Sequence, residues 1–296
     1  MKILMTGITG FIGHHLGERL VNDGHEVHAI VRPTSKVHEL SDNLREKVTF
    51  HVHDRENTVL DIVTDICVDG GGRPDVVFHL ATNFKTAHRF EDIQKLIQSN
   101  ITFGTELLDA MAANNVWNFV NAGTFEQAID DNLSPVNLYA ATKDCFEGIV
   151  NFYAATRGLK CIGLRLSDVY GADDKSRRLL GLMRESFSTG ETLHLSHSGQ
   201  LIDLIYIDDA VESFIAAKKL LAAGKYDYCG AYSVGLSRPV TLGEVVKIFE
   251  DVAGKKLSVK WSGRYISTNF RGTPRFLPNW SPKVSLRDGI KKFLGG

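Results

Sequence analysis

Met1 to Gly13 reads MKILMTGITGFIG, and this stretch decides the fold. The apolar run Ile3 to Met5 is typical of a strand that is buried on both faces of a parallel sheet. The run breaks at Gly7, and after Gly13 the apolar residues recur at helical spacing. A strand, a glycine turn and a helix in this order form the geometry that binds a dinucleotide pyrophosphate.

The three glycines of this stretch have separate expected roles. Gly7 permits the sharp turn, Gly10 leaves room for the phosphates, and Gly13 lets the helix and the strand pack closely. Three glycines alone could also form a purely structural turn. The strand before them and the helix after them favour a nucleotide site, to which Phe11 and Ile12 also belong.

The segment TGITGFIG, with a threonine before the spacing G-x-x-G-x-x-G, resembles the fingerprint of extended short-chain dehydrogenases/reductases, the NAD-dependent epimerase/dehydratase family. The resemblance implies an α/β fold, a Rossmann-type doubly wound parallel sheet with a smaller C-terminal substrate-binding domain. Strands and helices alternate as such a sheet requires. We expect residues 1–170 to form the dinucleotide-binding domain, with 203–235 returning to it. Residues 171–202 and 236–296 are then the substrate-binding domain.

The composition excludes several other classes of protein. The 296 residues are 43% hydrophobic and 23% charged, as in ordinary globular enzymes. A net charge of -1 offers no surplus of positive charge for nucleic acid or an anionic membrane. We expect no signal peptide, no membrane span and a cytoplasmic location. The four cysteines are scattered and lack a C-x-x-C pair, so we expect no metal site (Cys67, Cys145, Cys161, Cys229). The four thiols could pair, but we expect them to be reduced.

The choice of dinucleotide is expected to depend on the end of the second strand, Val27 to Val31. Sites that select NAD usually place an acidic residue there, to bind the ribose 2′-hydroxyl. This chain has Arg32, with Ser35 and Lys36 close behind. A guanidinium suits a 2′-phosphate, so the sequence favours NADP over NAD, although NAD is possible. The alternative is a solvated basic loop.

Further cofactor contacts are implied by the family resemblance. Asp54, after the strand Val48 to Val52, stands where relatives contact adenine, although it could equally be a turn residue. The segment His79-Leu80-Ala81-Thr82 resembles one that passes the cofactor's ribose and nicotinamide. We expect His79 to be packed rather than catalytic. Asn100 begins NITFGT, which resembles a helix segment of the family, and we count it with the cofactor site.

The predicted catalytic group is Thr124, Tyr139 and Lys143. Reduction of a carbonyl by hydride requires a proton donor at the carbonyl oxygen, and a tyrosine hydroxyl can serve. Tyr139 and Lys143 are four residues apart on a predicted helix from Asn137 to Arg157, so they share one face. We expect the ammonium to lower the pKa of the phenol and the Thr124 hydroxyl to orient the carbonyl. The resemblance implies that Lys143 also bonds the nicotinamide ribose.

Four later segments narrow the resemblance to bacterial CDP-abequose and CDP-paratose synthases. They read FVNAGTF, VNLYAATKDCFE, DVYGADD and HLSHSGQLIDLIYIDD. Those enzymes reduce a 4-keto group on a nucleotide-linked 6-deoxyhexose with NADPH. The resemblance places the nucleotide-sugar substrate near Thr124, Phe125, Glu126 and Asp168. It leaves four arginines as candidates for the diphosphate, each equally readable as a surface residue (Arg177, Arg178, Arg271, Arg275).

Three residues depart from the family's pattern. Phe125 stands where 4,6-dehydratases carry the aspartate of a T-D-E triplet, so dehydration is disfavoured, although Glu126 is kept. Asp168 replaces an asparagine common near the sugar. Ile202 replaces an arginine that is common before Asp203, which weakens the transfer of diphosphate contacts.

The sequence therefore predicts an NADPH-dependent reductase of a 4-keto-6-deoxy nucleotide sugar. One alternative is an epimerase or dehydratase that keeps NAD bound, and another is a dinucleotide-binding regulator without turnover. Several apolar residues on the helix from 138 to 157 exceed what one sheet face requires (Phe146, Ile149, Val150, Tyr153). By resemblance, this helix and the predicted helix over 92–113 pair with their copies, so we expect a homodimer.

Overall fold

The structure is a computed structural model, and it describes residues 1–68, 71–127, 135–224, 230–236, 238–263 and 275–295. Its centre is a seven-stranded parallel sheet in the order β11-β6-β5-β4-β1-β2-β3. The strands of this sheet are β1 (Lys2–Thr6), β2 (Glu26–Val31), β3 (Val48–Val52), β4 (Val76–His79), β5 (Asn118–Thr124), β6 (Lys160–Leu166) and β11 (Gly230–Val234). The doubly wound sheet predicted from the sequence is confirmed.

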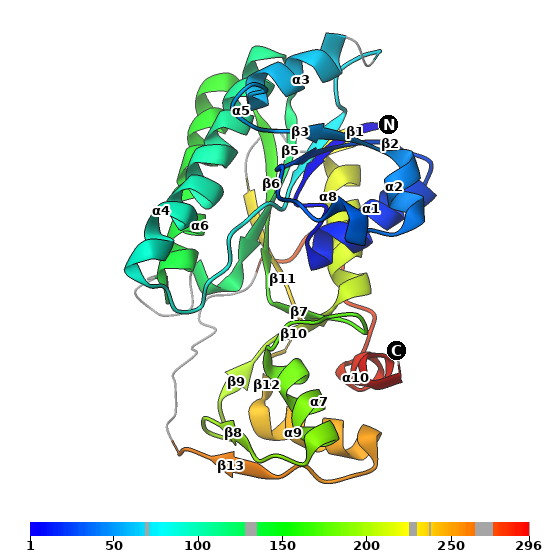
Figure 1. The fold of residues 1–296 in the computed structure, drawn as a ribbon, viewed down its shortest axis with the longest axis vertical. Helices are drawn as coiled ribbons and strands as arrows, with labels where there is room; N and C mark the ends of the chain where they lie inside the picture. The colour runs from blue at the N-terminus through cyan, green and yellow to red at the C-terminus, as the bar shows by residue number, and fades with distance from the viewer. Residues whose placement is uncertain (69–70, 128–134, 225–229, 237, 264–274, 296) are drawn as a thin grey trace.

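Helices cover both faces of this sheet (Figure 1). One layer contains α1 (Phe11–Asn22), α2 (Asp42–Lys47) and α8 (Ile207–Ala222). The other contains α3 (Val59–Val68), α4 (Ile93–Ile97), α5 (Phe103–Ala113) and α6 (Leu138–Arg157). The three central residues of β1 are apolar because both faces of the strand are buried: Ile3 and Met5 enter the core on the α1 side, and Leu4 enters the core on the α5 side.

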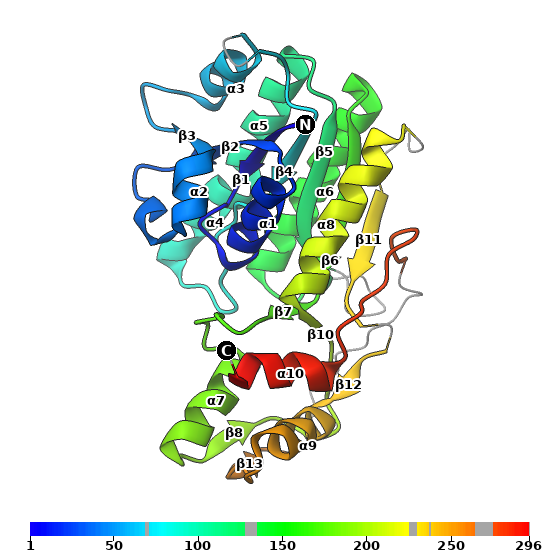
Figure 2. The ribbon, with the colours of Figure 1, turned by 90° about the vertical axis from the view of Figure 1, so that its right-hand side faces the viewer.

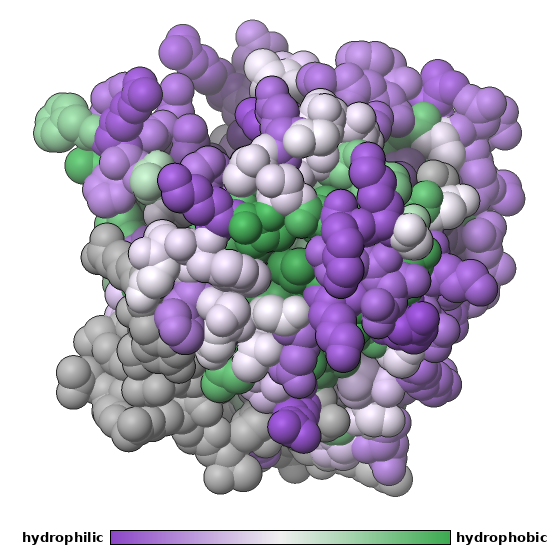
Figure 3. Space-filling view, turned by 90° about the horizontal axis from the view of Figure 1, so that it is seen from below, coloured by the Kyte–Doolittle hydropathy of each residue, from purple (hydrophilic) through white to green (hydrophobic). Residues whose placement is uncertain are grey.

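Three small two-stranded sheets and three helices lie beyond the carboxyl ends of the central strands (Figures 1 and 2). The strand pairs are β7 (Asp168–Tyr170) with β10 (Leu204–Tyr206), β9 (Leu201–Ile202) with β12 (Val240–Thr241), and β8 (Leu193–Leu195) with β13 (Val259–Trp261). The helices are α7 (Leu179–Thr189), α9 (Leu242–Ala253) and α10 (Leu286–Gly295). Seen from this end, the surface is largely hydrophilic around a central hydrophobic patch (Figure 3). The hydrophobic core on the α1 side of the sheet continues into α7, α9 and α10, so no separate core marks a second domain among the described residues. The division into a dinucleotide-binding and a substrate-binding domain stays a prediction.

The helix predicted over 92–113 is confirmed, and it contains a π turn at Gln98–Thr102 between α4 and α5. Asp209 lies in the first turn of α8. Its carboxylate accepts the backbone N–H groups of Lys283 and Val284, at 2.9 and 2.8 Å, and so attaches the C-terminal segment to α8.

The structure also bears on the state of the cysteines and on the search for a membrane-spanning helix. Cys67 and Cys145 are free thiols, but Cys161 is disulfide-bonded, so the expectation of reduced thiols is wrong for Cys161. Within the described part of the chain, no helix combines the length and the apolar character that a membrane crossing needs.

Candidate active site

The glycine turn between β1 and α1 fits a pyrophosphate. Gly7 has φ +79°, and a Cβ there would lie 2.6 Å from the backbone nitrogen of Ala81. A Cβ on Gly13 would lie 2.0 Å from the carbonyl oxygen of Gly7, so only glycine allows α1 to pack on the turn. Helix α1 has no side-chain cap and no acidic residue in its first turn. Its N-terminus therefore offers backbone N–H groups and a positive dipole end to an anion.

The residues predicted to contact the adenosine 2′-position follow β2. The Ser35 hydroxyl accepts the Arg32 N–H at 3.0 Å and closes a turn, and Lys36 pairs with Glu39 at 2.7 Å. The Arg32 side chain is exposed and makes no hydrogen bond or ion pair with another described residue. Of the predicted trio, Arg32 is therefore the residue whose charge is not paired with a described carboxylate.

Asp54, beyond β3, forms a turn. Its Oδ1 atom accepts the N–H groups of Glu56 and Asn57, each at 2.9 Å. This is the turn role that the sequence left open beside an adenine contact. The second carboxylate oxygen is not used by these two bonds.

The end of β4 lies directly against the glycine turn. The Thr6 hydroxyl lies 2.9 Å from His79 Nδ1 and accepts the N–H of Ala81 at 3.2 Å. Burial lowers the pKa of His79 to about 3, with the nearby charge of Lys143 as a second cause. The imidazole is therefore neutral and packed among phenylalanine rings, as predicted. Leu80 and Ala81 line the turn, as their expected place beside the cofactor requires.

Asn100 acts as a buried clamp. Its Oδ1 atom accepts the Thr82 hydroxyl at 3.0 Å and the Asn83 N–H at 2.7 Å. Its Nδ2 group donates to the Asn83 carbonyl at 3.1 Å and to the Thr142 hydroxyl at 3.0 Å. These four bonds use the full capacity of the amide. Asn100 was predicted to contact the cofactor, but the geometry makes it a residue that joins the loop after β4 to α6.

The predicted catalytic residues lie on β5 and α6, two elements that contact each other. Thr124 is the last residue of β5, and Tyr139 and Lys143 are buried one turn apart on α6. Asn137 joins the two elements, because its Oδ1 atom caps α6 at the Ala140 N–H and its Nδ2 group donates to Glu126 at 3.0 Å. All three side chains, two with a hydroxyl group and one with an amine, are buried, and we call this group of residues the buried corner.

Burial dominates the electrostatics of this corner. It raises the pKa of Tyr139 to about 12, and the hydroxyl of Thr82 only partly opposes it. Burial also lowers the pKa of Lys143 to about 8. The expectation that Lys143 lowers the pKa of Tyr139 is therefore wrong for this state of the protein, because desolvation outweighs any attraction between the two groups. The phenol is protonated at neutral pH.

Sequence reasoning missed a brace behind Thr124. The buried Gln127 accepts the Thr124 N–H at 2.8 Å and donates to Glu147 at 2.9 Å. Glu147 also accepts two hydrogen bonds from Arg165 of β6. Because Glu147 lies one turn beyond Lys143 on α6, the brace joins β5 to the helix face that carries Tyr139. The only sequence signal for this brace is the spacing of residues 139, 143 and 147, which places Glu147 on the helix face of Tyr139 and Lys143.

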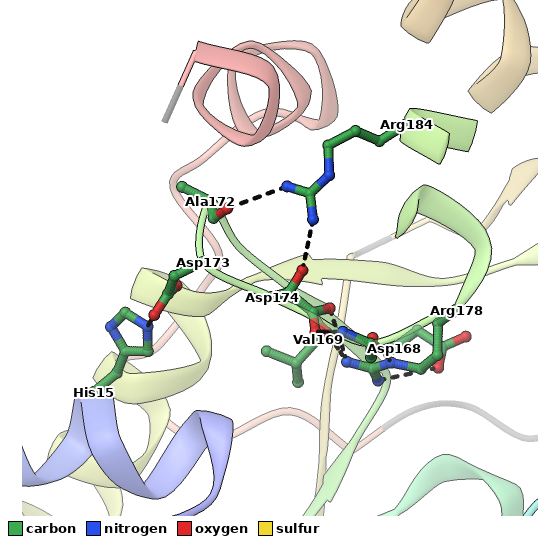
Figure 4. A network of polar contacts seen from close by, with 9 residues as sticks. His15, Asp168, Val169, Ala172, Asp173, Asp174, Arg178 and Arg184 are labelled. Atoms are coloured by element: carbon green, nitrogen blue, oxygen red, sulfur yellow. Dashed lines mark hydrogen bonds and ion pairs between the residues drawn. The ribbon is translucent and has the colours of Figure 1, made fainter. Parts of the chain in front are cut away.

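Charged groups line the side of the site nearest β6. Desolvation raises the pKa of Asp168 to about 6, against the attraction of Arg178 and with a further contribution from Glu126. Arg178 Nη1 lies 3.8 Å from Asp168, while Nη2 donates to the Val169 carbonyl at 2.6 Å (Figure 4). In the same network the Asp173 carboxylate lies 3.0 Å from His15 Nε2 of α1. This contact joins the loop after β7 to the helix that follows the glycine turn.

The other residues predicted to contact the substrate lie outside the network of Asp168 and Arg178. Arg177 pairs with Glu185 on the surface, away from this network. Arg275 stacks over the Tyr232 ring at 4.6 Å. Phe125 and Glu126 form the turn after Thr124, and the Glu126 N–H donates to the Thr124 hydroxyl at 3.3 Å. Arg271 lies outside the described residues.

The fold and this site define a nicotinamide-dinucleotide enzyme of the extended short-chain dehydrogenase/reductase class. The model of the NAD dependent epimerase/dehydratase family matches residues 3–235, and the chain belongs to that family. Similar proteins include Protein CapI of Staphylococcus aureus, 27% identical over 99% of this chain and 97% of that one. CDP-abequose synthase of Salmonella muenchen is 26% identical over the same shares.

A solved structure of UDP-glucose 4-epimerase with UDP-glucose, from Thermotoga maritima, superposes with a TM-score of 0.79. It is 25% identical, and the match covers 100% of this chain and 98% of that one. The family resemblance expected from the sequence is confirmed, as is the assignment to a nucleotide-sugar-modifying enzyme.

Proposed function

We propose that the protein reduces the 4-keto group of a 6-deoxy nucleotide sugar with NADPH. The observation that carries this proposal is the position of Thr124 at the end of β5 and of the buried Tyr139 at the start of α6, at the sheet edge where the glycine turn lies. A reductase needs a proton donor at the developing alkoxide. An enzyme that begins by oxidising an alcohol needs a base there instead.

Each residue of the buried corner has a distinct role in this reaction. The cofactor, when bound, supplies the hydride. The Thr124 hydroxyl orients the carbonyl oxygen, and Tyr139 Oη donates its proton to that oxygen. Lys143 provides a positive charge that stabilises the resulting phenolate and, by resemblance to the family, a hydrogen bond to the nicotinamide ribose.

The similarity to CDP-abequose synthase supports a reductase, and the similarity to UDP-glucose 4-epimerase supports the alternative. Arg32 favours a reductase over an epimerase, because it replaces the acidic residue typical of NAD sites. Phe125 counts against a dehydratase, because it removes the acid on which dehydration depends. A panel of 4-keto and 4-hydroxy sugar nucleotides, each assayed with NADPH and NADH, tests the proposal. Net consumption of NADPH with 4-keto sugars supports it, and its absence contradicts it.

Cofactor preference is expected to depend on Arg32. NADPH should bind more tightly than NADH, and Arg32→Asp should reverse the order by ~1–3 kcal/mol, because one charge-assisted contact to the 2′-phosphate becomes a repulsion. Arg45→Asp, at an exposed arginine on α2, is the control and should leave the ratio unchanged. Fluorescence titration of both cofactors measures it. Equal affinities in the unaltered protein would rule out this role for Arg32.

We further propose that the protein is a homodimer through helices α4 and α6. The residues expected to face a partner are mostly buried within the chain, since Phe146, Val150 and Tyr153 are each less than 9% exposed. Other apolar side chains on or next to these helices are exposed instead: Phe90 (88%), Ile93 (36%), Ile97 (38%) and Phe152 (56%). Exposed apolar side chains of this size favour association.

Light scattering at micromolar concentration should therefore give the mass of two chains. The double variant Ile97→Asp and Phe152→Asp should give the mass of one, because charges would be desolvated in the interface. The control Leu60→Asp changes an exposed leucine on α3 and should stay dimeric. A single-chain mass for the unaltered protein would contradict the proposal.

A further inference from the structure

An exposed phenylalanine lies beside the proposed proton donor. Phe84 follows β4 by five residues and is 46% exposed. Its ring meets the Tyr139 ring edge-on, with 4.9 Å between the centroids. Tyr139 itself is buried, so Phe84 supplies accessible apolar surface next to the ring whose hydroxyl must reach the substrate. Burying such surface against a ligand is favourable.

The backbone before Phe84 is held in place. Asn100 is fully buried, and three of its four hydrogen bonds hold Thr82 and both backbone groups of Asn83. On the other side, Lys85 pairs with Asp92 at 3.5 Å. The loop therefore presents the Phe84 ring from a fixed position, which selection by shape requires.

The two sides of the site differ in chemistry. The neighbouring strands run in the order β4, β5, β6, so Thr124 of β5 has Phe84 on its β4 side. On its β6 side are Asp168 and Arg178. The reacting carbon of the proposed substrate is C4, which lies near Thr124 and Tyr139. Its neighbour C3 carries a hydroxyl group, and its other neighbour C5 carries the exocyclic C6 group. The charged side suits hydroxyl groups, and the phenylalanine suits an apolar exocyclic group.

We infer that Phe84 is a specificity-determining residue, which selects a methyl rather than a hydroxymethyl or carboxylate group on the carbon next to the reacting one. The inference rests on the proposed function and assigns its 6-deoxy preference to one side chain. The ring contacts the methyl group directly. A hydroxyl or carboxylate in the same place would lose water without gaining a hydrogen bond from the ring.

The test uses matched ligands that differ only at that carbon. The affinities of UDP-glucose and UDP-6-deoxyglucose, and of CDP-glucose and CDP-6-deoxyglucose, are measured by calorimetry with NADPH bound. These sugars already carry the alcohol, so NADPH does not reduce them further. The unaltered protein should prefer the 6-deoxy member of the pair that it binds by roughly tenfold.

Three variants distinguish a specific role of Phe84 from the effect of changing any exposed apolar side chain. Phe84→Ser should reduce the preference to within about twofold, and Phe84→Leu should keep most of it, because leucine preserves an apolar side chain. Leu60→Ser, at an exposed leucine on α3, should behave as the unaltered protein does. Binding without a preference, or a preference that survives Phe84→Ser, would overturn the inference. Failure of every sugar nucleotide to bind would instead contradict the proposed function, and the inference with it.

Discussion

Tyr139→Phe should lower turnover by ~10²–10⁴ and leave cofactor affinity nearly unchanged. The substitution removes one hydroxyl and keeps the ring, whose contact with Phe84 is an edge-on packing that does not need the oxygen. Without the hydroxyl, the alkoxide that forms as hydride arrives has no proton donor. Stopped-flow measurement of hydride transfer, with a separate titration of NADPH, distinguishes the chemical step from binding.

Tyr153→Phe is the matched control. Tyr153 lies on the same helix and donates its hydroxyl to Asp109 at 3.0 Å, away from the catalytic corner. Its variant should keep near-normal turnover. Thr124→Val should also lower turnover with little change in fold, because the volume is preserved while the orienting hydroxyl is lost. Near-normal turnover in Tyr139→Phe would show that the proposed mechanism is wrong.

Lys143→Met should stabilise the protein without its cofactor and abolish most of its activity. The fold lowers the pKa of Lys143 from 10.5 to about 8 through burial, so at pH 7 the folded state holds an unfavourable buried ammonium. That shift corresponds to ~3 kcal/mol of lost stability. Methionine fills similar space without the charge, so we expect a higher free energy of unfolding together with weaker NADPH binding and slower turnover.

The pH dependence has a definite sign. Between the folded pKa of about 8 and the unfolded value of 10.5, the unfolded chain binds a proton that the folded chain has released. Stability therefore rises with pH through this window in the unaltered protein, and Lys143→Met should lack that rise. Urea unfolding at about pH 7 and about pH 10 measures both effects. Lys247→Met, at an exposed lysine on α9, is the control. Lower stability of Lys143→Met at pH 7 would contradict the account.

Much of the fold was predictable because it depends on local patterns. Strands buried on both faces are continuous apolar runs, and Met1 to Gly13 contains a strand, a turn and a helix start in sequence order. Residues 139 and 143 share a helix face by spacing alone. The small strand pairs were harder to predict, because two or three residues such as Leu201 and Ile202 carry no periodic signal.

The electrostatics of the site required the fold. Whether Lys143 lowers the pKa of Tyr139 depends on the balance between attraction and burial, and a sequence does not report burial. The four bonds of Asn100 and the brace through Gln127 join segments that are distant in sequence, so neither was foreseen. The exposed ring of Phe84 was also invisible, because a phenylalanine after a strand is more often part of the core.

Transfer of a labelled hydride tests the central claim most directly. The protein is mixed with NADPH that carries deuterium at the transferable position and with a 4-keto-6-deoxy sugar nucleotide, and the products are analysed by mass spectrometry and nuclear magnetic resonance. The account predicts one deuterium at C4 of the sugar alcohol for each NADP⁺ formed. A 4-keto sugar nucleotide that is recovered without deuterium, with no net oxidation of NADPH, would contradict it.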